Sequence, residues 1–383
     1  MHRLDRHQLV PLPVPYVDLV AQHRPLRAEL LDAVDQVLAH GQFILGPEVG
    51  AVEAAVAALA GVREAVAVNS GTDALILALR VLGIGHGDEV ITAPNSFVAS
   101  ASAIAQVGAR PVFVDVCEDY TLDAALLKTA LTGRTRAILP VHLTGCPADM
   151  DPIVAFAREH GLFVIEDCAQ AIGSSYKGRS VGGLGDLGCF SFHPLKTLNA
   201  CGDGGAITSN DPDRAVRLRE LRNLGLVSRG QSATWSGNSR LDTVQAGMLL
   251  VKLRYFDSWT TGRRENAAFY RRALANLPQV QLPLEPPDRQ AVYHTFIIQA
   301  ERRDALKEHL GTCGVGTAIH YPIPIHLQPC AAALAYRPGD FPQSERMADR
   351  ILSLPVYPEL RLEQLEHVAT CIHRFYENGG FNP

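Results

Sequence analysis

The sequence predicts an α/β protein built around a mainly parallel sheet. Short apolar runs at residues 89–93, 111–115, 136–142 and 162–167 alternate with stretches that have the spacing of amphipathic helices. Such alternation is typical of a parallel, doubly wound sheet flanked by helices. Because 383 residues exceed the size of one ordinary hydrophobic core, a smaller companion domain is also expected.

Changes in composition divide the chain into three parts. Residues 1–14 form a leader punctuated by prolines. Residues 15–252 hold the alternating strands and helices of a large domain. From residue 253 a long helical segment leads to short strand patterns such as YHTFIIQA and to a helix near 303–310. Residues 253–383 are therefore expected to form a small C-terminal α+β domain.

The other expected elements each have a local reason. Apolar residues recur every four positions in 24–40, which predicts a helix that Gly41 ends. Residues 42–47, with the sequence QFILGP, predict a loop because Gly46 and Pro47 interrupt the helical pattern. Further helices are expected around 52–59, 73–82, 123–131, 151–160 and 213–222, and further strands at 65–68, 187–192 and 206–209.

Composition gives no electrostatic reason to expect nucleic-acid or membrane partners. The formal net charge is −5 at pH 7 and the pI is near 6.3, so neither nucleic acid nor an anionic membrane is favoured. No apolar run approaches the roughly 20 residues of a membrane-spanning helix. Residues 1–15 lack the apolar segment of a signal peptide. A soluble protein of the cytoplasm is therefore expected.

The eight cysteines contain no C-x-x-C pair. This spacing argues against both a zinc site and the disulfide framework of a secreted protein. We therefore expect no metal site, and we expect the thiols to be buried.

The stretch from Leu162 to Ala206 carries the candidate chemistry. An apolar run at 162–165 leads directly into Glu166 and Asp167, as a buried parallel strand does when it delivers carboxylates to the carboxyl edge of a sheet, where ligands bind. A second run, 187–192, precedes Lys196, and four residues rich in glycine then allow a tight turn. Asp167 and Lys196 are expected to meet at one site.

An acid and a lysine at one site fit pyridoxal phosphate. This cofactor uses a carboxylate to hold its pyridinium nitrogen and a lysine as its Schiff base. From the residues alone, an exposed lysine and a strand-end acid in another kind of α/β enzyme fit the pattern at least as well.

Three motifs resemble those of a known family. EDCAQAIGSSYKG, GDLGCFSFHPLK and GDGGA occur in this order, and together they resemble the sugar aminotransferases of the DegT/DnrJ family. The resemblance extends from about Tyr16 to Tyr376. It implies fold type I of the pyridoxal phosphate enzymes, the aspartate aminotransferase superfamily, with a mainly parallel sheet in the large domain.

The resemblance also implies the two catalytic residues. Lys196 would form the Schiff base with pyridoxal phosphate and, once displaced by the donor amine, move the proton between substrate and cofactor. Asp167 would keep the pyridine nitrogen protonated. Gln170 would bind the ring hydroxyl, and Ser191 would add a hydroxyl to the phosphate contacts.

Three further cofactor contacts come from other segments. NSGTDALILAL predicts a strand that runs into a helix, and a helix N-terminus offers free amides to a phosphate; the resemblance assigns this role to Gly71 and Thr72. It places Phe97 on the pyridine face and Asn238 on the phosphate of a neighbouring subunit, which implies a homodimer with shared active sites. Judged from the residues alone, helix capping by Ser70 or Thr72, core packing by Phe97 and an exposed loop position for Asn238 are equally simple roles.

The substrate side is expected in the second domain. The segment IHYPIPIHLQ resembles the family branch that acts on keto-sugars linked to thymidine diphosphate, and His320, Tyr321 and His326 lie in it. A diphosphate needs cationic partners, and Arg229, Arg240 and Lys177 are candidates, although each fits an exposed surface charge as well. His193 stands where relatives have tyrosine or histidine, and its role is open.

These observations predict an aminotransferase of amino-sugar biosynthesis. It would move an amino group from glutamate to a nucleotide-linked keto-sugar, a dTDP-3-keto-6-deoxyhexose. An aminotransferase for a keto-cyclitol or a sugar without a nucleotide stays open. Sugar dehydratases with this fold carry histidine at the position of Lys196. A regulatory protein that kept the fold would have lost some of Asp167, Gln170, Ser191 and Lys196, all of which are present.

Overall fold

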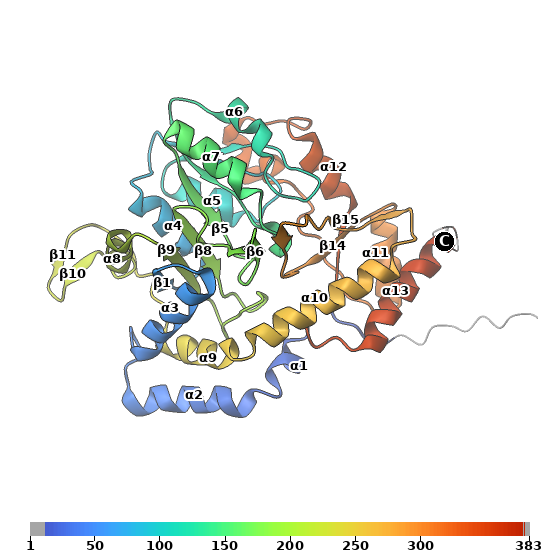
Figure 1. Cartoon of the computed structure of the whole chain (residues 1–383), viewed down its shortest axis with the longest axis horizontal. Helices are drawn as coiled ribbons and strands as arrows, with labels where there is room; N and C mark the ends of the chain where they lie inside the picture. The colour runs from blue at the N-terminus through green and yellow to red at the C-terminus, as the bar shows by residue number, and fades with distance from the viewer. Residues whose placement is uncertain (1–11, 378, 380–383) are drawn as a thin grey trace, which may run out of the picture.

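A computed structural model of the chain describes residues 12–377 and residue 379 (Figure 1). Of the leader expected at residues 1–14, only 12–14 are described. Val14 pairs with Val315 and packs among the buried side chains of the C-terminal part.

A seven-stranded sheet forms the centre of the large domain. Its strands lie in the order β1-β9-β8-β5-β4-β2-β3. Strand β9 is antiparallel to both of its neighbours, and the other neighbouring pairs are parallel. The expectation of an α/β fold with a mainly parallel sheet is confirmed. The strands are β1 (Glu64–Val68), β2 (Glu89–Thr92), β3 (Arg110–Phe113), β4 (Thr135–Leu139), β5 (Phe163–Asp167), β8 (Leu187–Ser191) and β9 (Gly205–Ser209).

The seven strands are those expected from the sequence, with ends shifted by no more than three residues. They form because short apolar runs are buried on both faces of the sheet, and β8 and β9 are buried along their whole length. The chain reverses between these two strands through residues 192–204. That connection holds Lys196 at the edge of the sheet.

Nine helices in the described part of the large domain surround this sheet. They are α1 (Leu19–His23), α2 (Arg27–His40), α3 (Pro47–Ala60), α4 (Gly71–Val81), α5 (Ala99–Gln106), α6 (Leu127–Ala130), α7 (Met150–His160), α8 (Pro212–Leu221) and α9 (Thr243–Leu253). The loop expected at 42–47 is one residue too long, because Pro47 begins α3. Proline suits the first position of a helix, where its missing amide leaves no hydrogen bond unmade.

A second buried core lies in the C-terminal part. Figure 1 shows α10 running from the side of α9 toward α13, which places the two cores at opposite ends of this helix. The elements are α10 (Phe256–Ala273), β12 (Val280–Gln281), β14 (Phe296–Ala300), α11 (Arg303–Thr312), α12 (Pro342–Arg350), β15 (Ile351–Leu354) and α13 (Leu362–Glu377). The domain boundary at residue 252 stays a prediction.

Two small antiparallel units complete the described chain. One sheet has the order β13-β6-β7 and joins the two domains, since β13 belongs to the C-terminal part. The other is a hairpin of β10 and β11. The bounds are β6 (Ser175–Tyr176), β7 (Arg179–Ser180), β10 (Leu226–Ser228), β11 (Gln231–Ser232) and β13 (Arg289–Gln290).

The cysteines are free, but not all of them are buried. Cys201 and Cys330 are exposed and Cys117 is half-buried, so the expectation of uniformly buried thiols is wrong for these three. Cys201 lies in the connection between β8 and β9, and Cys330 lies in a short 3-10 helix, Pro329–Leu334. None of the helices in the described residues is both long and apolar enough to cross a membrane.

Candidate active site

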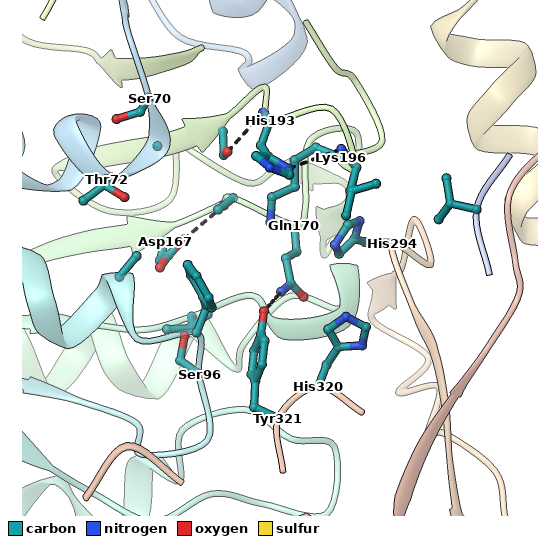
Figure 2. Close-up of a pocket in the computed structure, with 18 of the residues that line it drawn as sticks. Ser70, Thr72, Ser96, Asp167, Gln170, His193, Lys196, His294, His320 and Tyr321 are labelled. Carbon is teal, nitrogen blue, oxygen red and sulfur yellow. Dashed lines mark hydrogen bonds between the residues drawn. The ribbon is translucent and has the colours of Figure 1, made fainter. Parts of the chain in front are cut away.

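One pocket of about 420 Å³ gathers most of the candidate residues (Figure 2). It lies at the carboxyl ends of β5 and β8 and at the start of α4, and residues of the C-terminal part form its opposite wall. The candidates that line it are Gly71, Thr72, Phe97, Asp167, Gln170, Ser191, His193, Lys196, His320 and Tyr321.

Asp167 ends strand β5 and is buried beneath the pocket floor. Its carboxylate accepts hydrogen bonds from the Ser100 hydroxyl at 2.8 Å and from the Ala169 amide at 3.1 Å. These two hydrogen bonds hold the Asp167 carboxyl group in one orientation.

The neighbouring acid, Glu166, points to the other face of the strand. One of its oxygens accepts from the amides of Leu184 and Gly185, each at 2.8 Å, and the other from the Gly182 amide at 2.9 Å and from His142 at 3.0 Å. The Ala148 amide donates to the second nitrogen of His142. Successive side chains of a strand point to opposite faces. Asp167 therefore lines the pocket, whereas Glu166 binds the backbone amides on the other face.

The Glu166 network also bears on the expectation of no metal. Among the described residues, His142, Glu166 and Cys168 are close enough together to hold an ion. Each carboxylate oxygen of Glu166, however, already accepts two hydrogen bonds, and both nitrogens of His142 are engaged. The network is satisfied by the protein itself, so it gives no reason to invoke a metal.

Lys196 lies in the connection between β8 and β9. Its amide donates to the His193 carbonyl at 2.8 Å, and its own carbonyl accepts from the Asn199 side chain at 3.1 Å. Burial lowers the pKa of the Lys196 amine to about 8, while the attraction of Asp167 acts in the opposite direction. An appreciable share of this amine is therefore uncharged near neutral pH, as a nucleophile or base must be.

The N-terminus of α4 forms another part of the pocket wall, and its free backbone amides suit an anion. The Ser70 hydroxyl caps the helix by accepting from the Asp73 amide at 3.1 Å, so the cap is Ser70 rather than Thr72. The first amides of a helix have no partner within it. A β-carbon added to Gly71 would lie 2.6 Å from that of Ser191, so only glycine lets the Ser191 hydroxyl come this close to the helix start.

The opposite wall is tied to the first through one side chain. The Gln170 oxygen accepts from the Thr144 amide at 2.7 Å, and its nitrogen donates to the Tyr321 hydroxyl at 3.2 Å. Phe97 is 52% exposed, which excludes core packing as its role. Its ring centre lies 5.5 Å from that of Tyr321.

Comparison with known proteins identifies the family. Residues 25–373 match the DegT/DnrJ/EryC1/StrS aminotransferase family. This chain belongs to that family. The expected enzyme class, aminotransferase, and the expected cofactor of the family, pyridoxal phosphate, are confirmed.

Two relatives within the DegT family match almost end to end. The chain is 46% identical over 365 residues to dTDP-3-amino-3,4,6-trideoxy-alpha-D-glucose transaminase of Streptomyces venezuelae, covering 95% of this chain and 96% of that one. It is 47% identical over 362 residues to UDP-N-acetyl-3-dehydro-alpha-D-glucosamine 3-aminotransferase of Acidithiobacillus ferrooxidans, covering 94% and 97%.

The fold of the DegT family is confirmed by a solved structure. The crystal structure of S. venezuelae DesV in complex with a ketimine intermediate superposes with a TM-score of 0.94 at 46% identity. The match covers 96% of this chain and 99% of DesV.

The pocket of this DegT-family chain fits pyridoxal phosphate in three respects. The N-terminus of α4 suits a phosphate, the buried Asp167 suits a protonated ring nitrogen, and the Lys196 amine with its lowered pKa suits attack on an aldehyde. No single motif in the sequence places these three groups together. The edge of the parallel sheet does so.

Sequence reasoning missed part of the second wall. His294 and Arg263 line the pocket, and so does Tyr16. Burial lowers the pKa of His294 well below its usual value, with a further contribution from the charge of Lys196. The same two causes lower the pKa of His320 to about 4. Both imidazoles are therefore uncharged at neutral pH.

A signal for Arg263 was present in the sequence. On α10 it lies on the buried stripe with Phe256, Trp259, Ala267 and Tyr270, at helical spacing. A charged residue on an apolar stripe indicates either a buried pair or a ligand. His294 gave no comparable signal, since it precedes an ordinary buried strand.

Four substrate and cofactor candidates do not line the pocket of their own chain. His326 is buried and pairs with Glu345 at 3.0 Å. Arg240 donates to the Asn223 side chain at 2.8 Å. Arg229 is exposed in the turn of the β10–β11 hairpin, and Asn238 is exposed at the base of the hairpin, where it pairs with Asn223.

Lys177 also lies away from the pocket. It sits on the surface and donates to Asp151 at 2.7 Å. Nothing in this arrangement places its ammonium near the other candidate residues.

Proposed function

We propose that this chain transfers an amino group from glutamate to the 3-keto group of a nucleotide-linked 6-deoxysugar. The observation that carries the proposal is the pairing of the Lys196 amine, whose pKa is lowered to about 8, with the buried carboxylate of Asp167 in one pocket. Membership of an aminotransferase family gives this pair its chemistry.

The residues would divide the chemical work as follows. Pyridoxal phosphate, when bound, supplies an electron sink for charge that develops on the substrate carbon. Asp167, fixed by Ser100 and Ala169, holds the proton on the ring nitrogen. The Lys196 amine would move a proton between the substrate carbon and the cofactor.

The remaining contacts would hold the cofactor in place. The amides of Gly71 and Thr72 and the hydroxyl of Ser191 are suited to the phosphate. Phe97 would cover the ring face. Gln170 is oriented by its hydrogen bond from the Thr144 amide and so presents its amide nitrogen near the Tyr321 hydroxyl, on the side where a ring hydroxyl would bind.

The uncharged histidines support the proton transfer. His294 and His320 line the same pocket as Lys196, and burial keeps their pKa values low. A charged imidazole would repel a lysine ammonium. Because the pKa values of both rings lie below that of the Lys196 amine, the neutral rings are weaker bases, and Lys196 is the stronger base among the three.

The two relatives support amination at carbon 3. Their names describe a dTDP-linked and a UDP-linked sugar, each with carbon 3 as the position of the transferred amino group. We propose the dTDP-linked substrate, in line with the IHYPIPIHLQ segment. His320 and Tyr321 of this segment face the pocket, whereas His326 is turned into the protein to meet Glu345.

We further propose a homodimer with shared active sites. Figure 1 shows the β10–β11 hairpin projecting beyond α8. We call residues 224–238 the hairpin arm. Large apolar side chains are exposed on the arm and on the loop before α3: Phe43, Ile44, Leu45, Leu224, Val227 and Trp235. Ile44 pairs with Asp242, which brings this loop toward the chain that follows the arm.

An exposed apolar surface of this kind favours association. A second copy is the occupant we propose, because Asn238 and Arg229 lie on the arm with no place in their own pocket. In the dimer they would reach the cofactor phosphate and the substrate diphosphate of the partner subunit. A cytoplasmic location also stays a prediction.

The proposed reaction is tested by its two half-reactions. Purified protein loaded with pyridoxal phosphate should release 2-oxoglutarate from glutamate, and should then aminate a dTDP-linked 3-keto-6-deoxyhexose, as mass spectrometry and NMR of the product would show. A UDP-linked 3-keto sugar and a nucleotide-free keto-cyclitol are the competing substrates. A product without a new amino group would rule out transamination, and amination of the cyclitol alone would replace the sugar substrate.

A further inference from the structure

Arg263 is a buried cation that lines the pocket. Glu359 attracts it electrostatically but does not form an ion pair with it. Arg263 is 5% exposed. One terminal nitrogen donates weakly to the carbonyls of Tyr293 at 3.3 Å and His294 at 3.5 Å, and its Nε is buried with no partner. Among the described residues, no carboxylate forms an ion pair with it and its other terminal nitrogen, Nη2, makes no hydrogen bond.

The charges around the pocket leave Arg263 in a distinct position. Lys196 and Arg263 are the lysine and the arginine that line the pocket, and the two histidines that the C-terminal part contributes to the lining are uncharged. Burial lowers the pKa of Arg263 to about 10, which still leaves it charged at neutral pH. Lys196 must be uncharged to act as a base. Arg263 then keeps a positive charge in the pocket wall.

A buried guanidinium that is not directly paired with a carboxylate is costly, and a bound anion that pairs with it reduces that cost. The planar fork of arginine matches a carboxylate with two parallel hydrogen bonds. Lys196, Arg263 and His294 line the same pocket, and both cations act electrostatically on His294. An amino acid carries both an amine and a carboxylate, so it has one group for each of these side chains.

We infer that Arg263 binds a carboxylate of the amino donor. This inference rests on the proposed function and names the residue that distinguishes the two substrates of the same site. A sugar nucleotide is too large to bring its diphosphate to a side chain that is 5% exposed. A small amino acid reaches it, and the keto-sugar, which has no carboxylate, does not need it.

A neighbouring arginine provides a matched control. Arg264 also donates to backbone carbonyls of the same region, to Ala291 at 2.9 Å and to Gly173 at 3.1 Å, but it does not line the pocket. Arg263→Gln and Arg264→Gln therefore remove similar backbone contacts. Only the first removes a charge from the pocket.

The experiment compares the half-reactions of the cofactor-loaded enzyme. With Arg263→Gln, the glutamate concentration for half-maximal rate should rise about 10- to 100-fold, the scale of one lost charge-assisted hydrogen-bonded contact. Arg263→Lys should recover part of this. The reverse half-reaction with the amino-sugar nucleotide should keep its half-maximal concentration, and calorimetry should show 2-oxoglutarate binding weakened by the same factor. Arg264→Gln should behave as wild type.

Each other result overturns the inference in a recognisable way. Equal losses in Arg263→Gln and Arg264→Gln, or in both half-reactions, would assign Arg263 to positioning His294. If Arg263→Gln weakens binding of the sugar nucleotide alone, Arg263 contacts the diphosphate instead. If Arg263→Gln does not fold, Arg263→Lys decides, and unchanged glutamate and 2-oxoglutarate affinities would refute the carboxylate contact. A wild-type enzyme that releases no 2-oxoglutarate refutes the proposed function itself.

Discussion

The two walls of the pocket are assembled from different kinds of structure. The wall at the edge of the large sheet takes Asp167 from the end of β5 and Lys196 from the β8–β9 connection, so hydrogen-bonded strands fix the spacing of these groups. The opposite wall takes single side chains from α10, from the approach to β14 and from the segment after Gly316. It is joined to the first wall by the Gln170–Tyr321 hydrogen bond.

This difference suggests a division of labour. Groups that must hold one geometry throughout the reaction lie on the sheet edge, whereas groups that meet changing substrates lie on the second wall. Substitutions in the first wall should therefore lower the turnover number, and substitutions in the second should mainly change substrate affinity.

The largest effect is expected at Lys196. Lys196→Ala removes the amine that binds the cofactor and moves the proton, so turnover should fall by at least about 10⁴-fold. The visible absorption of the cofactor-loaded protein should disappear with it. Lys307→Ala, an exposed lysine on α11, is the control and should keep both activity and colour. A coloured, active Lys196→Ala protein would refute the assignment.

A smaller loss is expected at Asp167. Asp167→Asn removes the negative charge that holds the ring proton, and turnover should fall about 10²- to 10³-fold, as for the loss of one strong electrostatic contact. The cofactor should stay bound through Lys196. Stopped-flow measurement of the glutamate half-reaction checks this. Near wild-type rates would mean that another group holds the ring nitrogen.

A mixing experiment extends the comparison to the hairpin arm. Asn238→Ala should be nearly inactive if this residue completes the partner's site. When Asn238→Ala is mixed with an equal amount of Lys196→Ala and the subunits exchange, half of the dimers should contain one subunit of each kind. Each of these dimers should hold one intact site, so about a quarter of wild-type activity should return. Native mass spectrometry confirms exchange. Exchange without recovery would count against shared sites.

The electrostatic link between Asp167 and Lys196 predicts a pH dependence. In cofactor-free protein, acylation of the Lys196 amine should rise with pH around its pKa of about 8, and exposed Lys307 serves as the reference lysine for reagent reactivity. Because the carboxylate raises the pKa of Lys196, Asp167→Asn should move the midpoint to lower pH. Peptide mass spectrometry after pulse labelling measures both lysines, and a midpoint that moves upward would contradict the proposed coupling.

The smallest effect is expected on the second wall. Tyr321→Phe removes the hydroxyl that accepts from Gln170 but keeps the ring next to Phe97. One neutral hydrogen bond contributes about 1 kcal/mol, so the half-maximal sugar concentration should change by less than about tenfold. Steady-state kinetics checks it. A collapse of turnover instead would place Tyr321 among the groups that hold the reaction geometry.

The sequence allowed prediction of the first wall because local patterns carry it. An apolar run followed by an acid places Asp167 at the end of a parallel strand, and the glycines near Lys196 indicate a sharp return. Even there, the pattern did not separate Asp167 from Glu166. Only the burial of the opposite face, where amides and His142 surround Glu166, shows which of the two acids faces the pocket.

The second wall depends on long-range packing that local patterns do not encode. His320 and His326 lie in one motif, yet the short 3-10 helix Ile325–Leu327 turns His326 toward Glu345 and away from the pocket. Arg263 and His294 reach the pocket from separate segments. For Asn238 and Arg229, the neighbours that we propose belong to a second chain, so one chain alone does not assign them.

The hairpin arm carries a tryptophan whose fluorescence would change if two subunits associate through the arm. The sequence has two tryptophans, and they stand in opposite surroundings: Trp235 is 94% exposed on the arm, whereas Trp259 is 9% exposed and stacked against Tyr255 on α10. Intrinsic fluorescence of a lone subunit would therefore combine one red-shifted and one blue-shifted emitter. If the arm docks on a second copy, dilution below the dimer dissociation constant shifts the emission maximum to longer wavelength, and the change comes from Trp235 alone.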